Sequence, residues 1–73
     1  MEVWAVVEGL QRFLIHSSAY VRLFYSLDGE PEQILQAQLP EEAVDSGIQV
    51  GDRVRLTMVL RTVMEVRKVD QPV

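Results

Sequence analysis

Apolar and charged residues alternate over the last third of the chain. From residue 54 the even positions are mostly apolar: Val54, Leu56, Met58, Leu60, Met64 and Val66. The odd positions are mostly charged or polar: Arg53, Arg55, Thr57, Arg61, Glu65 and Arg67. A period of two places successive side chains on opposite faces of a strand, so the pattern predicts a strand with one buried face. The even set is expected to face the core, with Val59 and Val63 on the outer face.

This alternating stretch is longer than a usual strand of about 5–6 residues. We therefore expect it to break near Arg61 and Thr62, at a tight turn or bulge, into two successive strands.

Three earlier segments also have strand-like composition. Residues 3–7 form a compact apolar run, and Gly9 follows them at a point where we expect a kink or bulge. Residues 19–27 and 33–39 alternate, and Asp28 with Gly29 begins the turn that joins them into a hairpin. The positions predicted to face inward in this hairpin are Val21, Leu23, Tyr25, Leu27, Leu35, Ala37 and Leu39.

Two segments connect or end these strands. Residues 16–18, His-Ser-Ser, are expected to turn the chain. Residues 10–15 contain good strand formers, yet the pattern is compatible with either a strand or a loop. Residues 70–73 are expected to form a frayed tail.

Residues 40–47 have the signals of a brief helix. Pro40 stands near the first helical position, and two glutamates follow it, where the helix dipole favours negative charge. Gly47 stands where the chain must leave the helix in a left-handed conformation. Ile48 and Val50 are expected to pack this segment onto the sheet.

The order of these elements indicates the fold class. Five short strands, with a small helix between the third and the fourth, predict an all-β fold of the five-stranded OB-like barrel type. Closing the sheet into a barrel removes the edges that a small β protein must otherwise protect. An SH3-like small barrel is the alternative. Residues 1–73 are expected to form one OB-like domain.

Composition and charge narrow the function classes. The chain has 48% hydrophobic and 25% charged residues, as in an ordinary folded domain, and a formal net charge of -4. This excess of acidic residues disfavours nucleic acid as a partner, because phosphate binding relies on clustered Lys and Arg. With no cysteine, neither disulfides nor thiolate zinc sites can stabilise the small core, so self-association is the expected support. No membrane span or signal peptide is expected, and the default location is cytoplasmic.

One segment carries a family resemblance. Residues 41–54 resemble the part of the TOBE and molybdopterin-binding-like (Mop-like) modules in which an alanine-bearing helical turn leads through Gly-aliphatic into Gly-Asp-x-Val. Val63 and Met64 are similar to the closing strand of those modules, and the resemblance covers roughly half of the chain. It implies an OB-like barrel that pairs into dimers. In the oxyanion-binding members it implies a molybdate or tungstate site made by backbone amides, hydroxyls and a lysine.

The chain departs from that family pattern in two places. The N-terminus has no Ser-Ala-Arg-Asn-like stretch, and residues 58–62, Met-Val-Leu-Arg-Thr, replace the lysine-containing run. The resemblance therefore implies that a small anion would be held at a subunit interface by the charge of Arg61 and by hydroxyl groups. The candidate ligand-binding residues are Ser17, Ser18, Arg61 and Thr62.

Arginine and aromatic side chains on the predicted wet faces suggest a different ligand. On an OB barrel such side chains can form a platform for single-stranded nucleic acid. The candidate residues are Tyr20, Arg22, Phe24, Arg53 and Arg55. The competing interpretation is that strand arginines pair with acids such as Glu65, and for a net acidic chain this is the more frequent outcome.

The remaining candidates favour ordinary structural roles. His16 is a lone turn histidine without an acid or nucleophile at a suggestive spacing. Asp28, Glu30 and Glu32 crowd a turn but lack the spacing of a calcium loop. Trp4 and the other aromatic residues are expected in the core or at a dimer contact. No metal site and no cofactor are predicted.

The sequence thus predicts a non-enzymatic binding or assembly module that self-associates. Small-ligand or oxyanion binding at an oligomer interface is the first hypothesis. Single-stranded nucleic-acid binding and a purely structural protein–protein interaction are the alternatives. Enzyme function is not expected, because neither paired carboxylates nor a nucleophile with a base can be named.

Overall fold

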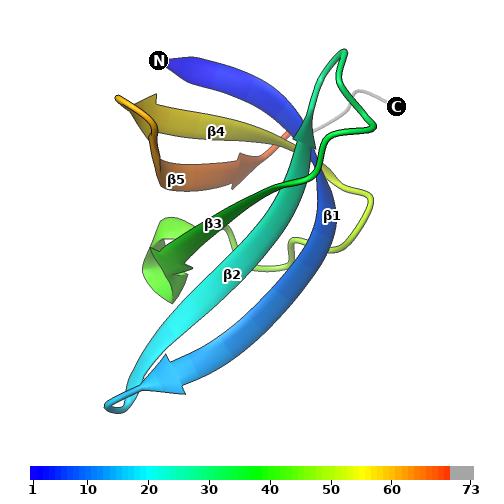
Figure 1. The fold of residues 1–73 in the computed structure, drawn as a ribbon. Helices are drawn as coiled ribbons and strands as arrows, with labels where there is room; N and C mark the ends of the chain where they lie inside the picture. The colour runs from blue at the N-terminus through cyan, green and yellow to red at the C-terminus, as the bar shows by residue number, and fades with distance from the viewer. Residues whose placement is uncertain (70–73) are drawn as a thin grey trace.

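The computed structural model describes residues 1–69 as one antiparallel sheet of five strands with a short helix (Figure 1). The elements are β1 (Glu2–Ile15), β2 (Ser18–Leu27), β3 (Leu35–Pro40), the 3-10 helix η1 (Glu41–Ala43), β4 (Arg53–Val59) and β5 (Thr62–Lys68). The strand order is β3-β2-β1-β4-β5, so β1 is central and β3 and β5 are the edges. The predicted all-β class with one brief helix is confirmed, and the sheet is not closed by pairing between its edges. The tail predicted at residues 70–73 lies outside the described residues.

A bulge at Gly9 divides β1 into two halves. Val7 lies opposite Tyr25 and Gly9 lies opposite Phe24, which leaves Glu8 as the extra residue. The kink or bulge predicted at Gly9 is confirmed. Glycine fits here because a Cβ atom at this position would stand 3.2 Å from the Cδ2 atom of Phe24. Residues 10–15, whose state the sequence left open, continue as strand.

The β1–β2 hairpin ends in a two-residue turn. Ile15 lies opposite Ser18, and the intervening His16 and Ser17 both have positive φ angles, 49° and 68°. Two successive positive φ values are those of a type I′ turn, whose twist matches that of the flanking strands. The turn predicted here is confirmed, although neither residue is the glycine or asparagine that such turns favour.

The buried side chains lie on the inner face of the sheet, as the alternation along the second and third predicted strands required. Val21, Leu23 and Tyr25 of β2 are buried, and Leu39 of β3 is buried with them. The apolar residues that are almost fully buried are Ala5, Val7, Val21, Leu23, Leu39, Ile48, Val54, Leu56 and Val66. Burial of this apolar surface provides the main free energy of folding.

The predicted inward positions of the last hairpin are wrong at Leu60, Val63 and Met64, whereas Val66 is buried as predicted. Leu60 and Met64 were expected to face the core, but they are 90% and 52% exposed, whereas Val63 is buried. At Val63 and Met64 the cause is a bulge: Thr57 lies opposite Glu65 and Met58 opposite Val63, which leaves Met64 without an opposite residue. One extra residue reverses which side chains face inward.

The break near Arg61 is confirmed, because the turn between β4 and β5 consists of Leu60 and Arg61. Leu60 has a positive φ of 57°. A side chain in a two-residue turn projects away from the sheet, which explains the exposure of Leu60.

The segment after η1 covers part of the β5 edge. Val44 forms a parallel bridge with Val66, and the Asp45 amide donates a hydrogen bond of 3.0 Å to the Val66 carbonyl. Covering an edge in this way protects it from pairing with other chains. Gly47 has the predicted left-handed conformation, with a φ of 82°, but the helix ends earlier, at Ala43, and the chain leaves it through Val44 in an extended conformation. Ile48 is buried as expected, but Val50 is 64% exposed and does not pack onto the sheet.

Candidate functional site

An aromatic cluster with one arginine lies on the outer face of the β1–β2 hairpin. We call Phe13, Tyr20, Arg22 and Phe24 the aromatic face. Phe13 lies opposite Tyr20 in the sheet, and their rings stack with centroids 6.0 Å apart and an interplanar angle of 24°. The Arg22 guanidinium carbon lies 5.1 Å from the centroid of the Phe13 ring, a cation–π arrangement.

Arg22 makes no ion pair with a carboxylate of residues 1–69. Its Nη1 donates a hydrogen bond of 3.1 Å to the Oε1 atom of Gln11. Its Nε is buried and has no acceptor among the described residues. A buried donor without an acceptor lowers the stability of the fold by about 1–3 kcal/mol. We therefore expect that a bound ligand or partner supplies the acceptor for this N–H group.

The neighbouring strand β3 continues this face toward the β4–β5 turn. Gln38 lies opposite Arg22, and Gln36 lies opposite Phe24. Both glutamines also line a hollow of about 190 Å³ between β3 and the start of β5, together with Arg61 and Thr62. Arg61 and Thr62, two of the four predicted ligand residues, therefore lie across β3 from the β2 part of the aromatic face. Tyr25 lines the same hollow, and burial raises the pKa of its hydroxyl.

Ser17 and Ser18, the other two predicted ligand residues, lie elsewhere. They are at the tip of the β1–β2 hairpin, and in Figure 1 this tip and the β4–β5 turn are at different ends of the molecule. A site that used all four residues would therefore need a second copy of the chain.

The predicted nucleic-acid residues are also divided between two places. Tyr20, Arg22 and Phe24 are on β2, whereas Arg53 and Arg55 are on β4, opposite Val6 and Trp4 of β1. Their guanidinium groups are already paired with acids. Arg53 donates a hydrogen bond to Asp28 and lies 5.5 Å from the Trp4 ring centroid. The Arg55 Nε lies 3.6 Å from a carboxylate oxygen of Glu2. For these two arginines the competing interpretation, pairing with acids, is confirmed.

Arg67 is paired in the same way. It donates hydrogen bonds to Asp45 at 2.7 Å and to Glu65 at 2.9 Å, and the Lys68 amide donates to the other Asp45 oxygen at 2.9 Å. The hydrogen bond from Arg67, followed by the one from Lys68, lowers the pKa of Asp45. These hydrogen bonds join β5 to the segment after η1, so Arg67 and Asp45 have a structural role.

Phe13 was missing from the predicted nucleic-acid residues. It lies in the segment that the sequence left open between strand and loop, and the bulge at Gly9 decides which of its side chains face outward. A signal was available in the residues: if residues 10–15 pair with residues 18–23 across the turn, Phe13 must lie opposite Tyr20.

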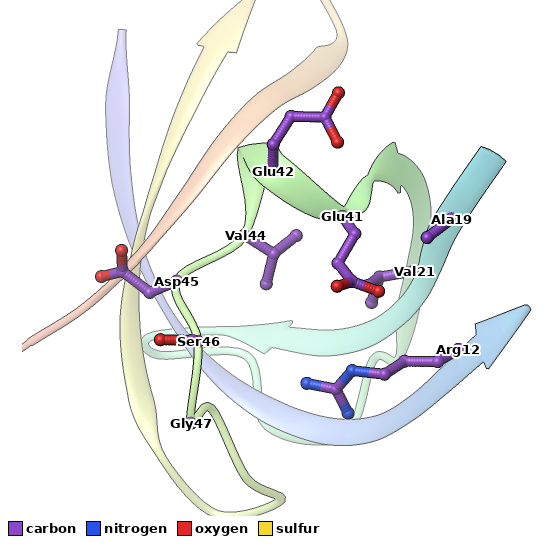
Figure 2. Close-up of a pocket in the computed structure, with 9 residues that line it drawn as sticks. All are labelled: Arg12, Ala19, Val21, Glu41, Glu42, Val44, Asp45, Ser46 and Gly47. Atoms are coloured by element: carbon purple, nitrogen blue, oxygen red, sulfur yellow. The ribbon is translucent and has the colours of Figure 1, made fainter.

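A second and larger hollow lies between the inner side of the β1–β2 hairpin and η1 (Figure 2). We call it the η1 cavity. Its volume is about 390 Å³, and its walls are formed by Arg12, Ala19, Val21, Glu41, Glu42, Val44, Asp45, Ser46 and Gly47. Sequence reasoning gave neither Arg12 nor Glu41 a ligand-binding role; Glu41 was considered only as one of the glutamates at the start of the brief helix and as part of residues 41–54.

Searches of protein-family models, of curated proteins and of solved structures found no match to this chain. The described residues contain no group of three His, Asp or Glu side chains that could hold a metal ion. Among the described residues no helix has the length and apolar character needed to cross a membrane.

Proposed function

We propose that this chain is a non-enzymatic binding module of OB type that holds single-stranded nucleic acid on its aromatic face. The observation that carries the proposal is the stack of Phe13, Tyr20 and Arg22 on the outer face of the β1–β2 hairpin. Stacked rings and a guanidinium offer flat surfaces on which bases can stack without base-specific contacts.

The arrangement of the strands supports the OB part of the proposal. An OB fold is a five-stranded, partly open barrel that binds its ligand on the face of strands 2 and 3, between the 1–2 and 4–5 loops. Here β1 is central, and the edge strands β3 and β5 approach each other across a small hollow. The aromatic face and its two glutamine neighbours occupy the corresponding part of the sheet.

The charges around the aromatic face favour nucleic acid more than the net charge of the whole chain does. The acids nearest to Arg53, Arg55 and Arg67 are engaged with those arginines. The residues across the sheet from Arg22 are the uncharged Gln11 and Gln38. With Arg22 on the face and Arg61 across β3 from it, we expect about one to two phosphate contacts and a shallow salt dependence.

Fluorescence anisotropy of a labelled oligothymidine tests the proposal. Tyr20→Ala removes one stacking surface and is expected to weaken binding about tenfold, since stacking contributes about 1–3 kcal/mol per base. Tyr20→Phe keeps the ring and is the matched control, with affinity close to that of the wild type. Arg22→Ala is expected to weaken binding and to flatten the salt dependence.

Arg55→Ala provides a second control, because Arg55 is paired with Glu2 and lies outside the aromatic face. Equal losses in Arg55→Ala and Tyr20→Ala would contradict the proposed face. Absence of binding at low salt would contradict nucleic acid as the ligand.

The hollow beside β3 favours a second candidate function, binding of a small oxyanion. Arg61 supplies a cation, Thr62 a hydroxyl, and Gln36 and Gln38 supply amide donors. Val59, Leu60 and Met64 are exposed apolar side chains on the same hairpin, which supports the expectation that two copies associate there. The TOBE-like resemblance predicts the same combination of anion and dimer.

Thermal unfolding with molybdate, tungstate and sulfate tests this candidate, alongside light scattering for the oligomeric state. We expect a rise in Tm with one of these anions in the wild type and a smaller rise in Arg61→Gln. An unchanged Tm in a large excess of all three anions would remove the oxyanion function from consideration.

A further inference from the structure

The η1 cavity is lined by opposite charges on facing walls. Figure 2 shows the Arg12 guanidinium extending from β1 and the Glu41 carboxylate extending from η1 toward the same space. The Glu42 and Asp45 carboxylates point away from it in the same view. Neither Arg12 nor Glu41 forms an ion pair within residues 1–69, so a gap separates the two charged groups.

Apolar side chains form the wall between these charges. Val21 and Val44 are buried core residues whose surfaces reach the cavity, and Ala19 lies beside them. The bulge at Gly9 places Arg12 here, because it brings Arg12 opposite Val21 on the inner side of the hairpin. The cavity thus joins a cation, a short apolar surface and a carboxylate.

We propose that the η1 cavity binds a small zwitterion, a free α-amino acid with an aliphatic side chain. The ligand carboxylate would pair with Arg12, its ammonium group would pair with Glu41, and its side chain would contact Val21 and Val44. This site is separate from the aromatic face, which uses the outer side of the same hairpin.

Size and charge both favour this class of ligand. A volume of about 390 Å³ lies near the lower end of the range for small-molecule sites, about 300–1,000 Å³, and accommodates an amino acid. An anion alone would leave Glu41 unneutralised at a short distance, and a cation alone would do the same to Arg12. A zwitterion satisfies both groups at once.

NMR titration of the isotope-labelled full chain with L-leucine tests the proposal. We expect saturable amide shifts at the cavity residues Ala19, Val21, Val44 and Gly47. Leucinamide lacks the carboxylate and N-acetylleucine lacks the ammonium group, and each is expected to bind about fivefold more weakly than leucine.

Two variants test which residue of the cavity binds which charged group of leucine. Arg12→Gln should abolish the difference between leucine and leucinamide, and Glu41→Gln should abolish the difference between leucine and N-acetylleucine. Both residues are exposed and make no ion pair in the described chain, so thermal unfolding is expected to remain unchanged. Arg55→Gln and Glu32→Gln, which lie outside the cavity, are the matched controls and should bind leucine like the wild type.

The proposal is overturned if the cavity amides show no saturable shift with leucine at tens of millimolar. It is also overturned if leucinamide and N-acetylleucine bind as well as leucine, or if the two cavity variants retain the wild-type preference. Oligonucleotide binding is measured on the other face, so failure of either proposal leaves the other standing.

Discussion

The two halves of β1 belong to the same strand but have different surroundings. Before the bulge, the strand lies between β2 and β4, and Ala5 and Val7 are fully buried. After the bulge, residues 10–15 pair with β2 alone, and none of them is buried. The first half contributes to the core, whereas the second half presents side chains on both of its faces.

The arginines differ in the same way. Arg53 and Arg55, beside the first half, are paired with Asp28 and Glu2. Arg12 and Arg22, on or opposite the second half, have no carboxylate partner among residues 1–69. Exposed ion pairs contribute little to stability, but they occupy the charges that would otherwise attract a ligand. Of these four arginines, the two without a carboxylate partner lie on the hairpin half of the sheet, and Arg61 in the β4–β5 turn is a further arginine without an ion pair within residues 1–69.

The largest expected effect is the difference in stability between two leucine-to-alanine variants, one in the core beside the first half of β1 and one in the second half. Leu56 is fully buried opposite Val3, so Leu56→Ala should lower the free energy of unfolding by about 3 kcal/mol. Leu14 is 71% exposed in the second half, and Leu14→Ala should change it by less than about 0.5 kcal/mol. Urea unfolding of both variants measures the difference, and similar losses would mean that the hairpin end is also part of the core.

An effect of intermediate size, a gain in stability, is expected from glycine substitutions in the two hairpin turns. Ser17→Gly and Leu60→Gly each relieve a left-handed conformation, which costs a residue with a side chain about 1–2 kcal/mol. After the flexibility of glycine is subtracted, each variant should be more stable by about 0.5–1 kcal/mol. Ser17→Ala is the control, because alanine keeps the strain and should give no gain in thermal unfolding.

The smallest expected effect is a difference in acid sensitivity. The folded-state pKa of Asp45 is lowered from 3.8, so its stabilising contribution is present above that value and is lost as the pH falls through the folded-state pKa. Asp45→Asn removes the titrating group. The decrease in unfolding free energy between pH 5 and pH 2, followed by urea unfolding at each pH, should therefore be smaller in this variant. An identical decrease in both proteins would show that the Arg67 network does not contribute to acid sensitivity.

Local patterns predicted most of the fold correctly. Alternation placed Val21, Leu23 and Leu39 on the buried face, and glycines marked the bulge at Gly9 and the left-handed conformation at Gly47. The prediction was wrong at Met64 because a bulge within β5 has no glycine to signal it. Its cause is the pairing of β5 with β4, which a single-strand pattern does not contain.

The sites were less predictable, because each joins residues that only the register brings together. Tyr20 and Arg22 were identified from their strand, but their contact with Phe13 depends on the bulge and on the two-residue turn. Arg12 and Glu41 are far apart in the sequence, and η1 has to fold back over the hairpin before they face one cavity. The acid partners of Arg53 and Arg55 also come from other strands.

The central position of β1 has a consequence for the order of folding. Pairing of β1 with β2, and of β2 with β3, involves neighbouring segments, whereas pairing of β1 with β4 brings Val3 to Leu56 across most of the described chain. Closing so long a loop costs entropy before any contact is gained, so folding is expected on a timescale of about milliseconds to seconds. During synthesis the first strand leaves the ribosome with its β4 partner still unmade, so its inner face stays uncovered until the last third of the chain follows.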